Sequence, residues 1–324
     1  MGLLPEKKTV PKQNFHEYMK VYYGEPSMGK TSTAAQNENA VFIMFEDGIA
    51  GLSVYAVNIP RIAKKEGKSR WDVFLDVVDE LLNSEHGFNE VVIDTADRAI
   101  DACGTYTERE TGLSDLAKGD WGSGWRKLFQ YFKEPLERLQ MSELGLTVIS
   151  HADMKEVTDI KGRARDKIVP SITGKSGQWL IDESDIVILF DKDEDNNRIM
   201  RVESTKNFDA KQRLKFPDGD IGMGKDETEA YKNLTKNFNK AVKNRNKELG
   251  ITEKQIKEYY KAQEEFKNKK DFQQLVDEII EECEKKGIGR TDNAKTINKK
   301  YGAKSLGELS YTQAEDYLKE LKSK

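Results

Sequence analysis

The sequence predicts an α/β protein, in which helices flank a mostly parallel sheet and a small helical C-terminal domain follows. Short apolar runs alternate with longer amphipathic stretches from residue 18 to about residue 207, as in sheets whose strands are joined by helices. Within 71–82, large apolar side chains recur at helical spacing. After residue 225 the chain becomes rich in Lys, Glu and Asn and reads as helical throughout.

The individual elements follow from run length and from the turn residues between the runs. Strands are expected at five apolar runs, 21–23, 40–45, 91–93, 146–149 and 186–190. Helices are expected over 71–82 and 125–139, and another begins after residue 31. The polar connection 191–197 predicts a β-hairpin that joins 186–190 to 198–205.

Composition shifts divide the chain into four segments. We expect a flexible N-terminal arm (1–17), an α/β core (18–225), a charged helical linker (226–250) and a small helical C-terminal domain (251–324). In the last segment an apolar stripe at helical spacing is followed by two shorter helices, 291–301 and 311–321. The stripe consists of Phe272, Leu275, Val276, Ile279 and Ile280.

Composition also excludes several classes of protein. The 324 residues carry a formal net charge of −4, 34% charged residues and two cysteines, which excludes a disulfide scaffold and a disordered chain. The longest apolar run, 40–45, is far shorter than the ~18 residues that a membrane span requires. We therefore expect a protein of the reducing cytoplasm with no membrane partner.

One motif carries the strongest chemical signal. Residues 24–31 match G-x-x-x-x-G-K-[ST], directly after an apolar strand and before a short helix. Glycines let backbone N–H groups point at a phosphate, and a helix N-terminus adds positive potential. The alternative is a chance glycine-rich turn. The predicted ATP-binding residues are Gly24, Glu25, Pro26, Ser27, Met28, Gly29, Lys30, Thr31 and Ser32.

Polar residues at the ends of three other strands complete the predicted site. Asp94 ends the strand 91–93 and is expected to hold Mg²⁺ together with Thr31, although an Asp here is also a common helix N-cap. Glu46 ends the strand 40–45 and is the candidate that orients water, with Asp47 as its rival; both could instead be capping or solvated residues. His151 ends the strand 146–149 and either senses the γ-phosphate or is an ordinary loop histidine.

In this order, the segments 24–31, 42–48, 91–95 and 148–151 resemble the phage-encoded short RecA-like P-loop NTPases that are grouped with single-strand annealing and recombination proteins. The resemblance covers about residues 17–215 and implies a RecA-like core at 18–225. It implies that Glu46 is the catalytic glutamate and that His151 couples the γ-phosphate to a DNA-binding loop. It also implies ATP sites shared between subunits of a homo-oligomer, with Lys206, or alternatively Arg201, reaching a neighbour's nucleotide.

Two long loop-like segments, 105–124 and 153–178, are the expected DNA-binding regions. Trp121 could stack on bases, and basic side chains could follow the phosphates of a single strand. The alternatives are a tryptophan that packs a helix start and an ordinary solvated segment. The basic candidates are Lys161, Arg163, Arg165, Lys167 and Lys175.

Together these features predict an ATP- and Mg²⁺-dependent recombinase that binds single-stranded DNA and promotes annealing or strand exchange in phage-type recombination. Its ATPase activity is expected to be DNA-stimulated, in a bacterial host cytoplasm. The alternatives are a RecA-fold helicase or helicase loader, and a nucleotide-gated adaptor with little turnover. The C-terminal domain is either an ordinary folded appendage or a docking module for a single-strand-binding protein.

Overall fold

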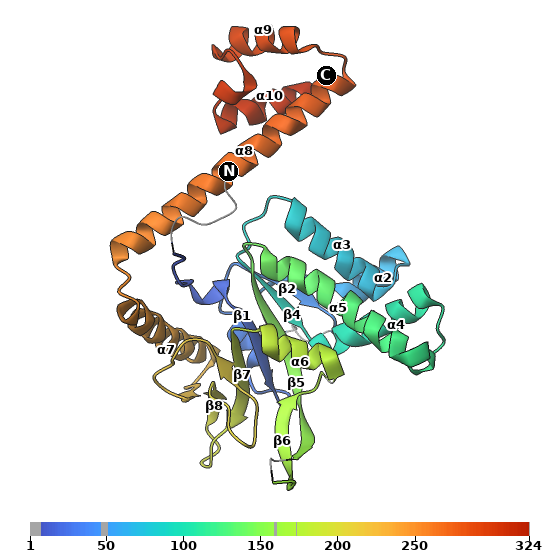
Figure 1. The fold of residues 1–324 in the computed structure, drawn as a ribbon, viewed down its shortest axis with the longest axis vertical. Coiled ribbons are helices and arrows are strands. Elements are labelled where there is room, and N and C mark those ends of the chain that lie inside the picture. Colours follow the sequence, from blue (N-terminus) through green and yellow to red (C-terminus); the bar gives the residue numbers. More distant parts are fainter. Residues whose placement is uncertain (1–7, 47–50, 159–160, 173, 324) are drawn as a thin grey trace. The chain divides into compact units, whose positions relative to one another are not determined.

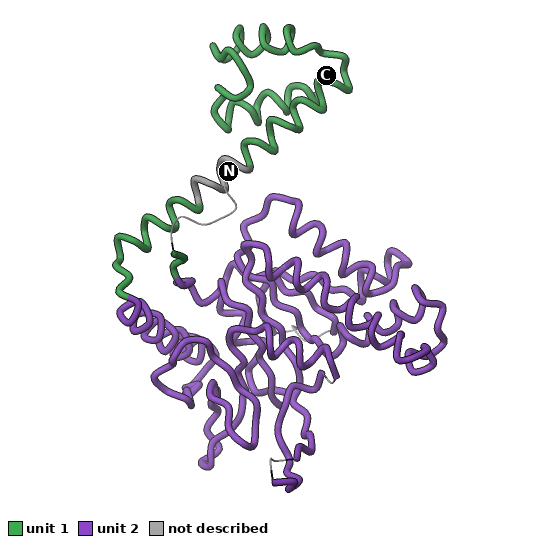
Figure 2. The backbone as a smooth tube through the Cα atoms, viewed as in Figure 1, with its two compact units in different colours: residues 1–10, 250–324 green, residues 11–249 purple. Residues whose placement is uncertain are grey.

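The computed structural model describes residues 8–46, 51–158, 161–172 and 174–323, with only the backbone described for 264–270. The chain divides into two compact units (Figure 2). The first comprises residues 11–249, and the second is built on residues 250–324. Among the described residues, no helix is both long enough and apolar enough to cross a membrane.

A mostly parallel sheet forms the centre of the first unit, in the order β10-β8-β7-β1-β5-β4-β2-β3 (Figure 1). The strands from β7 to β3 run parallel, whereas β8 and β10 are antiparallel to their neighbours. All five predicted strands are present. The strands are β1 (Met19–Gly24), β2 (Ala40–Met44), β3 (Tyr55–Asn58), β4 (Glu90–Asp94), β5 (Gly145–Thr158), β6 (Ala164–Pro170), β7 (Ile186–Lys192), β8 (Arg198–Arg201), β9 (Lys211–Gln212) and β10 (Asp220–Gly222).

Helices cover both faces of this sheet, because successive side chains of each strand point to opposite faces and both sets are apolar. One face packs against α2 to α6, and the other packs against α1 and α7 (Figure 1). The helices are α1 (Lys30–Ala34), α2 (Ile59–Glu66), α3 (Arg70–Asn83), α4 (Ala96–Thr111), α5 (Ser123–Met141), α6 (Gly174–Glu183) and α7 (Glu227–Glu248). The predicted fold class is therefore confirmed.

Both segments that were expected to be loops have regular structure. Within 105–124, α4 continues to Thr111, and two short 3-10 turns then lead into α5. Within 153–178, β5 continues past the sheet edge and pairs with β6 as an antiparallel hairpin, which projects beyond the sheet (Figure 1). The hairpin escaped prediction because both of its faces carry charged residues, so no apolar alternation marks it.

The expected N-terminal arm and the expected linker also differ from the structure. Residues 1–7 lie outside the described residues, but Phe15 is buried, with its ring 5.1 Å from that of Phe238 on α7. On α7, one face of the predicted solvated linker is packed into the core. Its buried apolar residues are Ala230, Leu234, Phe238, Ala241 and Val242.

The second unit has its own small core. It contains α8 (Glu253–Lys285), α9 (Arg290–Tyr301) and α10 (Tyr311–Ser323), so the two predicted short helices are present. Side chains from all three helices form one apolar cluster, which includes Leu275, Ile279 and Leu318. Inside it, the Tyr317 hydroxyl donates to Asn293 Oδ1 at 2.9 Å, so this buried amide is paired.

Candidate active site

The residues of the motif form a tight turn between β1 and α1, as the motif requires. Gly24 has a φ of +150°, and a β-carbon there would lie 2.3 Å from the carbonyl oxygen of Phe190. Gly29 has a φ of +90° at the N-cap of α1. Any side chain at either position would be strained, so the glycines are required by the backbone itself. The loop thereby directs the N-terminus of α1 toward the edge of the sheet.

Lys30 lies folded over this loop. Its side chain is buried, and its ammonium donates to the carbonyl oxygens of Gly24 and Glu25, both at 2.8 Å. Burial lowers the pKa of Lys30, and the neighbouring carboxylates only partly oppose this effect. A buried ammonium satisfied by carbonyl dipoles would gain strongly from an anionic partner, and phosphate oxygens supply one.

Thr31 and Asp94 meet at the same edge, as expected from the sequence. The Thr31 hydroxyl donates to Asp94 Oδ2 at 2.8 Å. Burial raises the pKa of Asp94 from its ordinary 3.8 to about 6, and the negative charge of Glu46 adds to this effect. A divalent cation would relieve a buried carboxylate of this kind. Since Mg²⁺ typically takes one or two protein ligands together with phosphate oxygens, this pair fits it.

Glu46 follows β2 beside Asp94. The backbone N–H of Phe45 donates to the carbonyl of Asp94 at 2.8 Å, which fixes the end of one strand against the other. The Glu46 carboxylate is partly exposed and lies 3.7 Å from Arg98 Nε. It therefore faces solvent at the site, as a residue that orients water must. Its rival Asp47 lies outside the described residues.

His151 is paired in register with Gly24, so β5 brings it beside the phosphate loop. Its Nδ1 is buried without a hydrogen-bond partner in the described part of the chain. Its backbone N–H donates to Asp97 Oδ2 at 3.0 Å. The Asp97 carboxylate also accepts hydrogen bonds from Ser150 and Ser171, and burial raises its pKa.

Asp97 is the member of this network that sequence reasoning missed. It stands three residues after Asp94, in the first turn of α4. Asp94 ends β4 and α4 begins at Ala96, so the usable signal was a second carboxylate in the first turn of the helix that follows the strand end. The two carboxylates divide the work. Asp94 faces the phosphate loop, whereas Asp97 holds the segment that follows β5.

The two candidates for a contact with a neighbouring subunit differ in availability. Lys206 is exposed in a turn where Ser204 and Asn207 form local hydrogen bonds. Arg201 is already engaged, with ion pairs to Asp191 at 2.9 Å and Asp220 at 2.7 Å. An arginine paired with two carboxylates would have to lose both to reach elsewhere, so Lys206 remains the better candidate.

A cleft of about 990 Å³ lies next to Asp97, between α4, the start of α5 and the start of α6. Both predicted DNA-binding segments contribute to it. Trp121 is 94% exposed at its rim, and Lys175 lines it from α6. Apolar side chains line much of the rest, including Ile100, Leu128, Phe129 and Ile172. The structure thus brings Trp121 and Lys175 together beside the His151 network.

The other basic candidates lie on the β5–β6 hairpin and not in the cleft. Cross-strand pairing places Lys167 opposite Lys155, and Arg165 opposite Val157, so these three cations share one face. Glu156 pairs with Asp166 on the other face. Of the basic residues, Lys167 already forms an ion pair with Asp209. The remaining candidates, Lys161 and Arg163, are exposed near the end of the hairpin.

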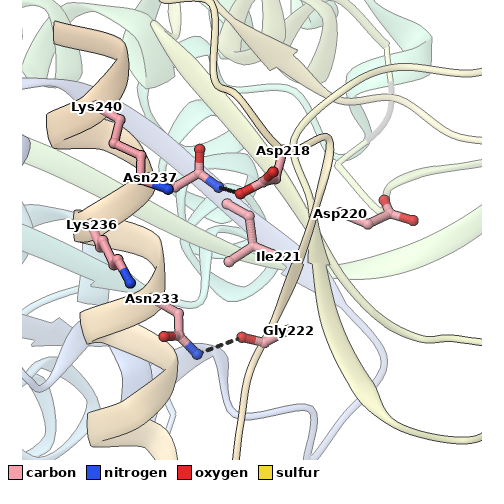
Figure 3. Close-up of a pocket in the computed structure, with 8 residues that line it drawn as sticks. All are labelled: Asp218, Asp220, Ile221, Gly222, Asn233, Lys236, Asn237 and Lys240. Atoms are coloured by element: carbon pink, nitrogen blue, oxygen red, sulfur yellow. Dashed lines mark hydrogen bonds between the residues drawn. The ribbon is translucent and has the colours of Figure 1, made fainter. Parts of the chain in front are cut away.

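A smaller hollow of about 220 Å³ lies between α7 and β10 (Figure 3). Asn237 donates to Asp218 at 2.8 Å and Asn233 to the carbonyl of Gly222 at 3.0 Å, so these contacts join the helix to β10 and to the loop before it. Lys236 and Lys240 line it from α7. It contains no residue of the phosphate loop or of the strand-end carboxylates, so the larger cleft is the one connected to the candidate site.

A loop of this kind, with its lysine, its hydroxyl and a buried aspartate on a nearby strand, defines a P-loop NTPase. Comparison with protein families agrees: residues 16–214 match a family described as an AAA domain, and the chain belongs to that family. The match begins just before β1 and ends beyond β9, so it covers the candidate site. No curated protein matches the chain.

Proposed function

We propose that the protein is an ATP- and Mg²⁺-dependent recombination protein that binds single-stranded DNA and promotes annealing or strand exchange. One observation carries the proposal. Asp97 holds the backbone of His151 beside the phosphate loop and also lines the cleft that contains Trp121 and Lys175. A change at the γ-phosphate that moves His151 would therefore reach the cleft through one carboxylate.

At the nucleotide, each residue has a distinct task. Lys30 exchanges its carbonyl partners for phosphate oxygens, and the backbone N–H groups of the loop bind the same phosphates. Thr31 and Asp94 would hold Mg²⁺, which would supply positive charge against the negative charge that develops on the phosphates. Glu46 orients a water molecule for attack on the γ-phosphorus. The bond to the bridging oxygen breaks, and ADP and phosphate are released.

At the DNA, the cleft and the hairpin take different parts of the strand. The cleft combines exposed tryptophan with apolar walls and carries the carboxylates of Asp101 and Glu108, which suits bases better than phosphates. The exposed cations of the hairpin, Lys161 and Arg163, suit the phosphates. Bases would stack against Trp121 while the backbone of the strand runs toward the hairpin.

Assembly and partners form the remaining part of the proposal. Lys206 is exposed and positively charged, which supports a contact with the nucleotide of an adjacent subunit in a homo-oligomer. The second unit folds around its own core, which supports a separate docking role, for instance toward a single-strand-binding protein. A phage origin and action in a bacterial host cytoplasm follow from the resemblance alone.

Steady-state ATP hydrolysis at low salt, with and without single-stranded DNA, tests the proposal. We expect DNA to stimulate hydrolysis, Glu46→Gln to abolish turnover, and Asp97→Asn to lose the stimulation while nucleotide still binds. ATP binding without DNA-stimulated turnover would instead indicate a nucleotide-gated adaptor. Duplex unwinding in the same assay would indicate a motor.

The DNA contact has a matched pair of variants. Base stacking on an aromatic side chain contributes roughly 1–3 kcal/mol per base, so Trp121→Ala should weaken single-strand binding about tenfold or more. Tyr55 is another exposed aromatic residue, on β3 and outside the cleft, so Tyr55→Ala should leave binding unchanged. Equal affinities of the two variants would remove Trp121 from the DNA site.

A further inference from the structure

The flank of the phosphate loop that faces away from β5 carries an ion pair with no assigned role. A β-carbon built on Gly29 would lie 3.4 Å from Arg198 Nη1 and 3.5 Å from Glu227 Oε1. Arg198 begins β8, and Glu227 is the first residue of α7. Their charged groups are joined at 2.9 Å. The pair therefore lies directly against the last glycine of the loop.

The electrostatics of the site leave room for a second cation. Four carboxylates act on Lys30, those of Asp94, Asp97, Glu46 and Glu25. A nucleoside triphosphate brings further negative charge to the same place. Among the described residues near the loop, Arg98 is already directed at Glu46, 3.7 Å away. Arg198 lies on the other side of the loop, with its Nη1 3.4 Å from the β-carbon position of Gly29.

The Arg198–Glu227 pair is built so that it can open. Both side chains are about 30% exposed (28% and 31%), and such partly exposed pairs contribute little net stability. Hydrogen bonding to Arg198 lowers the pKa of Glu227, and a hydrogen bond to a backbone N–H of the helix adds to this. Since Glu227 lies at the N-terminus of α7, the helix still stabilises its negative charge after the arginine leaves.

The backbone around the pair is fixed, so only side chains have to move. β8 is hydrogen-bonded to both β7 and β10. The first turn of α7 is tied to the segment after α1, because the Thr228 hydroxyl donates to Gln36 Oε1 at 2.8 Å. A guanidinium in this position can turn from a carboxylate to a phosphate, since both accept its paired N–H donors.

We infer that Arg198 is a nucleotide-binding residue that pairs with Glu227 when no nucleotide is bound and turns to the phosphates when nucleotide binds. The inference rests on the proposed nucleotide site and adds a residue to it. In this arrangement Glu227 competes with the nucleotide for one guanidinium. Removal of Arg198 should then weaken nucleotide binding, whereas removal of Glu227 should strengthen it. A purely structural ion pair would not give these opposite effects.

The test is calorimetric titration of the full-length protein with Mg·ADP, which binds without turnover. Arg198→Gln should weaken binding about tenfold, as expected for the loss of one charge-assisted contact. Glu227→Gln should tighten binding about threefold or more, and in the Arg198→Gln background it should have no effect. Arg198→Lys should recover part of the loss because the charge remains.

Matched controls separate this competition from a general change of charge. Arg213, which pairs with Asp185 at 3.4 Å near the opposite end of the sheet, and Glu229, which caps the loop before α7, are replaced by Gln. Both variants should bind like the wild type.

Two results would overturn the inference while the proposed function stands: Arg198→Gln binding within twofold of a binding-competent wild type, or Glu227→Gln weakening binding as Arg198→Gln does. If the wild type itself binds no nucleotide, the proposed function fails instead.

Discussion

The two ends of the same sheet each bring together a buried lysine, a buried carboxylate and a threonine, but the contacts among the three residues differ. At the amino end, Lys20 lies 3.1 Å from Glu90, and both side chains are almost fully buried. The Thr147 hydroxyl donates to the same carboxylate, and the ammonium also donates to the carbonyls of Phe15 and Tyr18. Every charge there has a partner within the protein.

At the carboxyl end of the sheet, the lysine and the carboxylate have separate hydrogen-bond partners. Among the described residues, the Lys30 ammonium donates to two carbonyl oxygens, and Asp94 accepts a hydrogen bond from the Thr31 hydroxyl. Asp94 is buried, and its pKa is raised to about 6 because burial outweighs the hydrogen bond from Thr31 and the positive charge of Lys30. The comparison separates a structural cluster from a candidate binding site. In the structural cluster the charged groups pair with one another, whereas at the candidate site we expect bound nucleotide and Mg²⁺ to pair with them.

The largest effect is expected at the structural cluster. Lys20→Met leaves the Glu90 carboxylate buried and unpaired, and breaking a buried pair in this way typically costs about 3–5 kcal/mol. Urea unfolding measures the free energy of unfolding directly. Lys68→Met is the control, since Lys68 pairs with Asp76 on the surface, where ion pairs contribute little, and its free energy of unfolding should stay close to that of the wild type. Equal losses in both variants would show that burial does not govern the pair.

Replacing the lysine at the carboxyl end should affect nucleotide binding much more than stability. Lys30→Ala removes a buried ammonium that forms no ion pair with a carboxylate in the described part of the chain, so the free energy of unfolding should change little. Nucleotide affinity should fall about 100-fold, because charge-assisted phosphate contacts are lost.

Thermal unfolding with and without Mg·ADP checks the Lys30 variant. Nucleotide at 100 times its dissociation constant stabilises a protein by about 2.7 kcal/mol, and the variant should gain almost none of this. The exposed Lys64→Ala is the control. A Lys30 variant stabilised like the wild type would contradict the assignment.

The two ends of the sheet also differ in how much of each could be predicted from the sequence. The phosphate loop is a local signal, because its chemistry lies within eight consecutive residues. Glu46, Asp94 and His151 could be placed at one edge from the sequence because the strand ends of a parallel sheet meet there. The Lys20–Glu90 pair was invisible, since only the register of β1, β5 and β4 brings two distant polar residues together inside a core.

Three further errors have physical reasons. β3 is four residues long and at best partly buried, and the short apolar run at 54–57 that marks it was overlooked. The linker prediction for 226–250 followed composition, although Ala230, Leu234, Phe238 and Ala241 repeat at helical spacing and signal a buried face. Arg198 and Glu227 gave no signal at all, because their relation to Gly29 depends on how α7 packs beside the loop.

The smallest effect is expected from pH, which changes how much the buried charge of Asp94 lowers the free energy of unfolding. Since the pKa of Asp94 is raised from 3.8 to about 6, the folded chain favours the protonated carboxyl. Its contribution to stability is therefore complete below pH 3.8 and is lost as pH rises through 6. Asp94→Asn keeps an acceptor for Thr31 without the charge, so it should stabilise the protein at pH 7.5 by on the order of 2 kcal/mol. At pH 4.5 most of this gain should disappear.

Urea unfolding of both proteins at the two pH values measures this gain in stability, with the exposed Asp195→Asn as the control. A gain in stability that is equal at both pH values would show that burial does not raise the pKa of Asp94. The contrast between the two ends of the sheet would then not hold.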